Sequence, residues 1–322
     1  MRPTKRKRSN NDALRLAERK SPRRRRRVPI LAALLVVLVG TCMIGYPFAS
    51  DYLNKLEQAK VTQDLAHTIE ESPEEDLSAY MQQAIDYNER LLSGAAYVVD
   101  PFEPDAPTAT DEDYANCLNL NGDGVMGQIV IPKIGVNLPI SHGTEGSGMD
   151  HGVGHVTNTS LPVGGESTHS VLAGHTGLPS AVIFDKLDQL EVGDYLIIQV
   201  LGEDHAYRVT STEVVLPDDT SSLGVKQGED LVTLVTCTPY GVNSHRLLVH
   251  AERCEMPQDW LERKASGDTA LPFPYETGSQ SFPPFLVGIL IALATILSYS
   301  VFKLVRRRLT PTGRHGRRRG FR

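Results

Sequence analysis

The stretch TLVTCTPYGVNSHR, residues 233–246, joins an apolar β-branched run to Cys237 and, across a turn-prone loop, to Arg246. A strand that ends near Cys237 and a strand that begins at Arg246 would pair antiparallel, which would make the two side chains neighbours. A fixed cation favours thiolate over thiol, and the thiolate is the nucleophile. The planar guanidinium can also stabilise the oxyanion that forms when a carbonyl is attacked. The stretch therefore predicts a β-hairpin that carries a reactive cysteine.

Acyl transfer by a thiol also needs an acid/base group, and the chain offers ten histidines. His175 has the most persuasive setting, because it ends the apolar run HSVLAGH and is flanked by Gly174 and Gly177, which let other groups approach closely. His245, next to Arg246, is its main competitor. Four others are interpreted as loop or strand-edge residues: His142, His151, His155 and His169.

Short apolar, β-branched runs follow one another between residues 127 and 254, separated by Gly, Pro, Asp and Asn clusters. They are GQIVIP, VNLPI, HSVLAGH, DYLIIQVL, AYRVTSTEVVL, LVTLVT and RLLVHAER. This spacing predicts an all-β barrel or sandwich. Residues 51–93 are expected to be helical, residues 100–113 to form an acidic, proline-rich loop, and residues 255–283 to form a linker without periodicity.

Charge is strongly segregated along the chain. Residues 1–27 carry 13 Lys/Arg and residues 303–322 carry 9, which leaves 11 basic and 37 acidic residues between them. The acidic centre argues against nucleic-acid binding by this part of the protein.

Two apolar stretches without charged residues, 28–48 and 284–302, abut the basic tails. Each is long enough for a membrane-spanning helix, which needs about 20 residues. The positive-inside rule then places both tails in the cytoplasm and the acidic centre outside. The first stretch exceeds the usual apolar region of a signal peptide, about 7 to 15 residues, which favours a retained anchor over a cleaved signal peptide.

Three of the four cysteines, Cys117, Cys237 and Cys254, fall in the acidic centre, and Cys42 lies in the first apolar stretch. An odd number of cysteines in an extracytoplasmic segment suggests a chemical role for one of them. A disulfide between Cys117 and Cys254 would leave Cys237 as the free thiol, but the sequence leaves this pairing open.

On these motifs the chain resembles the sortase family. TLVTC (233–237) matches the family's TLxTC signature, GHTG around His175 matches its histidine segment, and Arg246 falls at its arginine position. Wider similarity to the pilus-assembling class C sortases runs through IPKIGVNLPISHGT, TSLPVGGESTHSVLAGHTGLP and TCTPYGVNSHRLLV, within about residues 75–254. The DPF at residues 100–102 resembles the Asp-Pro-aromatic motif of the class C lid, which assigns Asp100 and Phe102 to a lid over the active site.

The resemblance implies a mainly β fold, a sortase-type closed β-barrel of about eight strands with N-terminal helices, flanked by two transmembrane helices. The expected order is a basic cytoplasmic tail (1–27), a transmembrane helix (28–48), a helical segment (49–98), a lid and loop (99–126), the catalytic barrel (127–254), a linker (255–283), a second transmembrane helix (284–302) and a basic cytoplasmic tail (303–322).

The implied chemistry is transpeptidation, with no metal and no organic cofactor. Cys237 would attack the Thr–Gly carbonyl of an LPXTG-type sorting signal on a pilin, and a lysine amine of another pilin subunit would resolve the thioester. His175 would act as acid and base, while Arg246 would position the substrate and stabilise the oxyanion. The partners would be pilin subunits, and the enzyme would lie in the cell membrane with its catalytic domain outside.

Two alternatives remain open. A housekeeping sortase that attaches surface proteins to peptidoglycan would use the same three residues. A wall-anchored sortase substrate is the other, because LPFPYETG (271–278) precedes an apolar stretch and a basic tail. Its Pro274 and Thr277 lie three positions apart, however, whereas an LPXTG motif needs two.

Overall fold

The computed structural model describes residues 27–94, 98–103, 112–144, 149, 152–266 and 299–300. The chain divides into two compact units, Met1–Gly267 and Asp268–Arg322, and nearly all the described residues belong to the first. This first unit holds a β-barrel together with the helices that precede and follow it.

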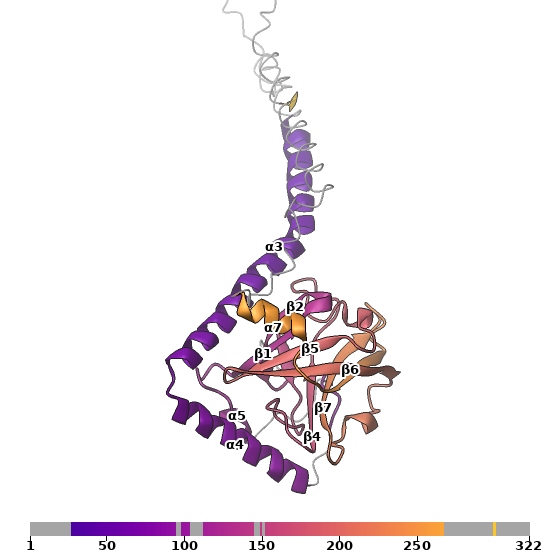
Figure 1. The fold of residues 1–322 in the computed structure, drawn as a ribbon. Helices are drawn as coiled ribbons and strands as arrows, with labels where there is room; N and C mark the ends of the chain where they lie inside the picture. Colours follow the sequence, from indigo (N-terminus) through magenta and orange to yellow (C-terminus); the bar gives the residue numbers. More distant parts are fainter. Residues whose placement is uncertain are drawn as a thin grey trace, which may run out of the picture. The chain divides into compact units, whose positions relative to one another are not determined.

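Eight strands close into the barrel (Figure 1). In chain order they are β1 (Val125–Ile131), β2 (Val136–His142), β3 (Val153–His155), β4 (Thr168–Ala173), β5 (Tyr195–Val200), β6 (Glu203–Val215), β7 (Asp230–Thr238) and β8 (His245–Arg253). Around the barrel they follow the order β1-β2-β3-β4-β7-β8-β6-β5. The prediction of a mainly β, closed barrel of about eight strands is confirmed. The three-residue strand β3 matches none of the runs that the sequence analysis identified.

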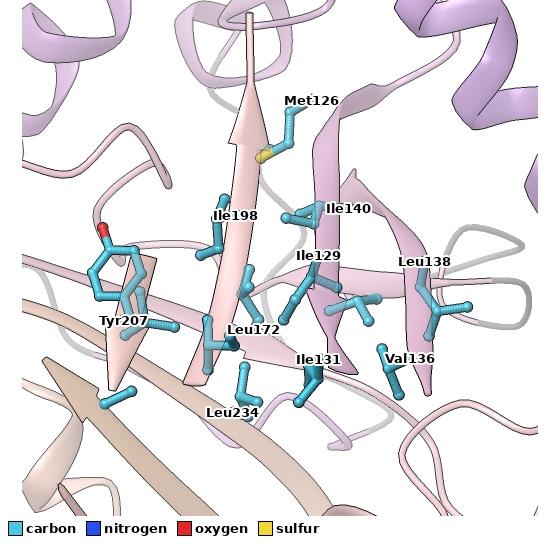
Figure 2. Close-up of a cluster of buried hydrophobic side chains, with 14 of the residues drawn as sticks. Met126, Ile129, Ile131, Val136, Leu138, Ile140, Leu172, Ile198, Tyr207 and Leu234 are labelled. Atoms are coloured by element: carbon cyan, nitrogen blue, oxygen red, sulfur yellow. The ribbon is translucent and has the colours of Figure 1, made fainter. Parts of the chain in front are cut away.

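The strands enclose one large apolar core. Ile129 and Ile131 of β1, Leu172 of β4 and Leu234 of β7 are fully buried in it (Figure 2). All six residues of β4 and six consecutive residues of β7 are buried, so both faces of these two strands are covered. Their near-continuous apolar sequences follow from this two-sided burial.

The pairing of the central strands brings distant parts of the chain to one end of the barrel. Strand β4 pairs parallel with β7, with Ala173 opposite Val235, and β7 pairs antiparallel with β8. The last residues of β4 and β7 therefore lie beside the first residues of β8. A parallel pair needs a long crossover connection, and here the connection contains β5 and β6.

Among the described residues, two long helices precede the barrel, α3 (Arg27–Glu71) and α4 (Glu74–Ser93). The side chain of Asn54 in α3 donates to the Ser180 carbonyl at 2.6 Å. Asn88 in α4 donates to the Leu161 carbonyl at 3.1 Å and accepts from the Leu161 amide at 2.7 Å. The predicted helical character of residues 51–93 is confirmed, with a break at residues 72–73, where Pro73 precedes three acidic residues of the first turn of α4.

The other helices among the described residues are short. They are α5 (Glu112–Asn116), α7 (Gln258–Ala265) and the 3₁₀ turns η1 (Pro132–Ile134), η2 (Leu187–Gln189) and η3 (Ser221–Leu223).

Helix α7 corrects the interpretation of residues 255–283 as an irregular linker. It begins directly after Pro257, a residue that is well tolerated at a helix start. Trp260 is buried and its indole N–H donates to Asp204 of β6 at 2.9 Å, while Lys264 bonds the same carboxylate at 2.8 Å. Tertiary contacts with the barrel thus stabilise a helix that its eight residues would not form alone.

Among the residues that the structure describes, no helix combines the length and the apolar character that crossing a bilayer requires. The expected second span and the two basic tails lie outside those residues, apart from Arg27 and residues 299–300.

Candidate active site

Cys237 and Arg246 face each other across the β7–β8 hairpin. Register pairs Cys237 with Arg246, which confirms the predicted antiparallel arrangement. Cys237 is 9% exposed. Burial raises the pKa of its thiol, the Arg246 cation lowers it and the Asp100 carboxylate raises it, so that the pKa lies above its ordinary value. In this arrangement the protonated thiol of Cys237 is therefore favoured over the reactive thiolate.

Arg246 is held by two sets of acceptors. Its Nη1 donates to the backbone carbonyls of Asn243 and His245, both at 3.2 Å. Its Nε and Nη2 donate to the two carboxylate oxygens of Asp100 at 2.8 and 2.6 Å. The backbone contacts fix the guanidinium within the hairpin, while the bidentate fork is taken up by Asp100.

The segment that carries Asp100, residues 98–103, covers the end of the barrel where Cys237 and Arg246 lie. The Phe102 ring lies 5.5 Å from the His175 ring, and the Arg246 guanidinium lies 5.1 Å from the Phe102 ring, measured between centres. The Thr220 hydroxyl donates to the Val98 carbonyl at 3.1 Å. Phe102 also packs against a second apolar cluster, formed by Met149, Val156, Val171, Ala173, Leu223, Val235 and Leu248. Both lid residues that the resemblance implies thus contact Arg246, Asp100 through its carboxylate and Phe102 through its ring.

His175 lies two residues beyond the end of β4, beside the end of β7. The Gly174 amide donates to the Val235 carbonyl at 3.0 Å, and the Thr236 hydroxyl donates to the Gly174 carbonyl at 2.7 Å. A side chain at Gly174 would collide with Phe184, because a Cβ there would lie 2.6 Å from that ring. These contacts fix the backbone before His175 against the residues before Cys237. Thr236 was not singled out in the sequence analysis, because Thr233 and Thr238 of the same strand carry the same hydroxyl group and the sequence does not distinguish the three.

The competing histidine lies on the other side of the hairpin. His245 pairs with Thr238, and its Nδ1 lies 2.9 Å from the Ser244 hydroxyl. Successive residues of a strand point to opposite faces, so His245 points away from the face that Cys237 shares with Arg246. The geometry therefore favours His175 as the acid/base residue.

Two other histidines are buried within strands, which corrects their interpretation as loop or strand-edge residues. Burial lowers the pKa of His155 and of His169 to about 4. His155 Nδ1 lies 2.9 Å from the Tyr114 hydroxyl, and His169 Nε2 lies 2.7 Å from the Thr233 hydroxyl. Both act as neutral parts of the barrel's polar interior. His151 lies outside the described residues.

The four cysteines, all within the described part of the chain, form no disulfide with one another. Cys117 belongs to the large apolar core, and Cys254 is half-buried after β8, where burial raises its pKa. A Cys117–Cys254 bridge is therefore absent. The residues described here also contain no group of three or more His, Cys, Asp or Glu side chains placed to hold a metal ion.

Comparison with known proteins agrees with the resemblance to sortases that the sequence shows. A family model described as Sortase domain matches residues 129–254. The crystal structure of sortase C-1 from Actinomyces oris is 50% identical and covers 56% of this chain and 99% of that chain, with a TM-score of 0.52. A sortase C structure from Streptococcus pneumoniae is 34% identical and covers 61% of this chain and 97% of that chain, with a TM-score of 0.56.

Sortase D of Bacillus subtilis is a more distant relative, 31% identical over 130 residues. This alignment spans 39% of the chain and 63% of the relative, just under two thirds of its length. With a sortase domain model over the barrel and class C sortases among its structural neighbours, this chain belongs to the sortase family of cysteine transpeptidases.

Proposed function

We propose that this protein is a class C sortase that builds covalent pili. It cleaves an LPXTG-type sorting signal of one pilin between Thr and Gly and joins the new acyl group to a lysine amine of another pilin. The observation that carries the proposal is the bidentate contact between Asp100 and Arg246, which is the contact that an acidic lid over the active site would make. The similar Streptococcus pneumoniae sortase C is described in terms of pilin substrate specificity, which supports the choice of substrate.

The first half of the reaction forms a thioester. The Cys237 thiolate attacks the threonine carbonyl carbon, and the Nε and Nη2 donors of Arg246, once Asp100 has left them, stabilise the resulting oxyanion. Collapse of this intermediate breaks the Thr–Gly bond, and His175 gives its proton to the departing glycine amine. A carbon–sulfur bond has then replaced the carbon–nitrogen bond.

The second half transfers the acyl group. The amine of the acceptor lysine attacks the thioester carbonyl and loses a proton to His175. The carbon–sulfur bond breaks, an isopeptide bond remains, and Cys237 leaves as a thiolate. His175 thus acts first as an acid and then as a base, which restores the starting protonation.

The lid must move before this cycle can begin. Asp100 occupies the Nε and Nη2 donors that the oxyanion needs, and it raises the pKa of Cys237. Departure of the lid frees the donors and removes a negative charge beside the thiol, so that opening and activation of the nucleophile occur together.

We also propose a location in the cell membrane, with two spans, cytoplasmic termini and an extracytoplasmic barrel. This arrangement rests on the sequence, through the apolar stretches 28–48 and 284–302 and the basic runs that flank them.

The test is incubation of the full-length chain with candidate pilins, followed by a denaturing gel. A covalent ladder that forms with the wild type and is absent with Cys237→Ala supports the proposal. Products that form only with peptidoglycan cross-bridge amines as acceptors would assign the housekeeping reaction instead.

A further inference from the structure

A pocket lies at the end of the barrel opposite Cys237. Its volume is about 670 Å³, and it lies between α4, residues 163–168 and the ends of β6, β7 and β8. We name it the α4 groove. Asp230 at the start of β7 lines it, and Cys237 follows seven residues later on the same strand. At a rise of about 3.3 Å per residue the two are roughly 23 Å apart, so the groove is separate from the active site.

His205 lines this groove and has an unused donor. Its side chain is 95% buried, with 5% relative exposure, and its Nδ1 lies 2.9 Å from Arg253 Nη1. Arginine can only donate, so Nδ1 is the acceptor and the neutral ring carries its proton on Nε2. Within the described part of the chain this Nε2 has no hydrogen-bond partner, and the Glu203 carboxylate is 3.9 Å away. This Nε2 is buried, so a ligand acceptor satisfies it only after the neighbouring exposed Glu203 side chain moves aside.

Among the described residues that line the groove, the one arginine is already compensated. Arg253 Nη1 lies 3.6 Å from the Asp230 carboxylate, which also accepts hydrogen bonds from the Gly165 amide and the Tyr207 hydroxyl, both at 2.9 Å. This pair and its partners therefore leave little charge for a ligand.

Three further carboxylates line the groove, those of Glu89, Glu166 and Glu203. Among the described residues, none of the three has a lysine or arginine within ion-pair distance. They lie next to apolar side chains of α4, including Ile85 and the half-exposed Leu92. The groove thus combines unpaired negative charge with an apolar wall.

A lysine residue within a peptide matches all three features. Its ammonium suits the carboxylates, its four-carbon stem suits the wall of α4, and its backbone carbonyl can accept from His205 Nε2. We propose that the α4 groove binds a lysine-containing segment of a pilin, at a docking site separate from the one where the reactive lysine meets Cys237. The choice of a pilin as the source rests on the proposed function.

Binding is measured by fluorescence anisotropy with the full-length chain and labelled acetyl-Leu-Lys-Leu amide. A matched peptide with norleucine in place of lysine keeps the stem and removes the charge. We expect the lysine peptide to bind about fivefold to tenfold more tightly, since its ammonium is attracted by three carboxylates, each of which adds the modest contribution typical of an exposed ion pair. Equal affinity of the two peptides would overturn the proposal.

The double variant Glu89→Gln/Glu203→Gln tests the groove itself. Its control is Glu229→Gln/Glu252→Gln, which removes the same charge from a different hollow between β6, β7 and β8. We expect the Kd of the lysine peptide to rise about fivefold in the first variant, which removes two of the three exposed carboxylates, and less than twofold in the control. An equal rise in both would mean that affinity follows net charge alone, which would refute a specific groove.

Purified pilin then tests the source of the lysine. In Glu89→Gln/Glu203→Gln we expect the KM for the acceptor pilin to rise severalfold, with unchanged cleavage of a short LPXTG-type peptide. Unchanged polymerisation by a variant that has lost peptide binding would show that the occupant is not a pilin. Tight peptide binding by a wild type that forms no ladder with any pilin would contradict the proposed function and leave the groove supported.

Discussion

The guanidinium of Arg246 binds the carboxylate of Asp100 through two hydrogen bonds, although 146 residues separate them in sequence. Both side chains are largely buried, with 10% and 6% exposure. The same arginine keeps Nη1 on the carbonyls of Asn243 and His245. Release of Asp100 would therefore free two donors of a guanidinium that the hairpin still holds in place.

Replacement of both Asp100 and Phe102 by Ala should open the active site. If only a few per cent of the molecules are open, removal of the lid contacts raises the accessible fraction by about tenfold or more. We expect a corresponding increase in the rate at which a thiol reagent modifies Cys237 and in cleavage of a short LPXTG-type peptide. The circular dichroism spectrum should not change.

The control for this variant is Glu103→Ala, which removes an exposed acid from the same segment without touching the two contacts. It should leave thiol modification within twofold of wild type. Unaltered reactivity of Cys237 in a folded double variant would show that the segment is an ordinary acidic loop.

The pH dependence of thiol modification should move when Asp100 is replaced. Burial and the Asp100 carboxylate raise the pKa of Cys237, and Arg246 lowers it. Removal of the carboxylate removes a raising contribution and leaves the lowering one, so the thiolate forms at a lower pH. Iodoacetamide kinetics between pH 6 and pH 10 should show a midpoint displaced toward acid in Asp100→Asn. A midpoint displaced toward base would contradict this electrostatic account.

Strand alternation and loop length were enough to predict that Cys237 and Arg246 face each other. The lid contact needed the family resemblance, since no local pattern joins residue 100 to residue 246. Strand β3 was missed because three residues are too few to form a periodic pattern. Helix α7 was missed because its stability comes from Asp204, a residue more than 50 positions earlier. The burial of His155 and His169 likewise depends on tertiary neighbours that the sequence does not reveal.

The two candidate histidines can be separated by a pair of matched variants. His175→Ala should lose nearly all cleavage and transfer activity, because His175 lies beside the Phe102 ring on the covered end of the barrel. His245→Ala should retain substantial activity, because alternation turns that side chain away from Cys237. Steady-state cleavage of a fluorogenic LPXTG-type peptide measures both. The reverse result would move the acid/base role to His245.

Arg246→Lys separates charge from shape. Lysine keeps the positive charge but lacks the planar fork that reaches both oxygens of a carboxylate or stabilises an oxyanion from two directions. We expect kcat to fall at least a hundredfold, the range typical for loss of an oxyanion donor. Near wild-type turnover would mean that a point charge suffices, and the oxyanion role would then be rejected.

Thr236 should act as a positioning residue, since its hydroxyl ties the strand of Cys237 to the carbonyl of Gly174, next to His175. Thr236→Val keeps the shape and removes the donor, so the distance between nucleophile and acid is no longer fixed. We expect kcat to fall by about tenfold with KM within twofold, because small misplacement of reacting groups lowers the rate more than binding.

Thr236→Ser restores the hydroxyl and should recover most of this loss, which a purely apolar packing role would not predict. The matched control is Thr210→Val, whose hydroxyl donates to the His250 carbonyl at 3.3 Å on an exposed part of β6. That variant should leave kcat unchanged. A kcat for Thr236→Val equal to that of wild type would show that backbone pairing between β4 and β7 alone holds His175 beside Cys237.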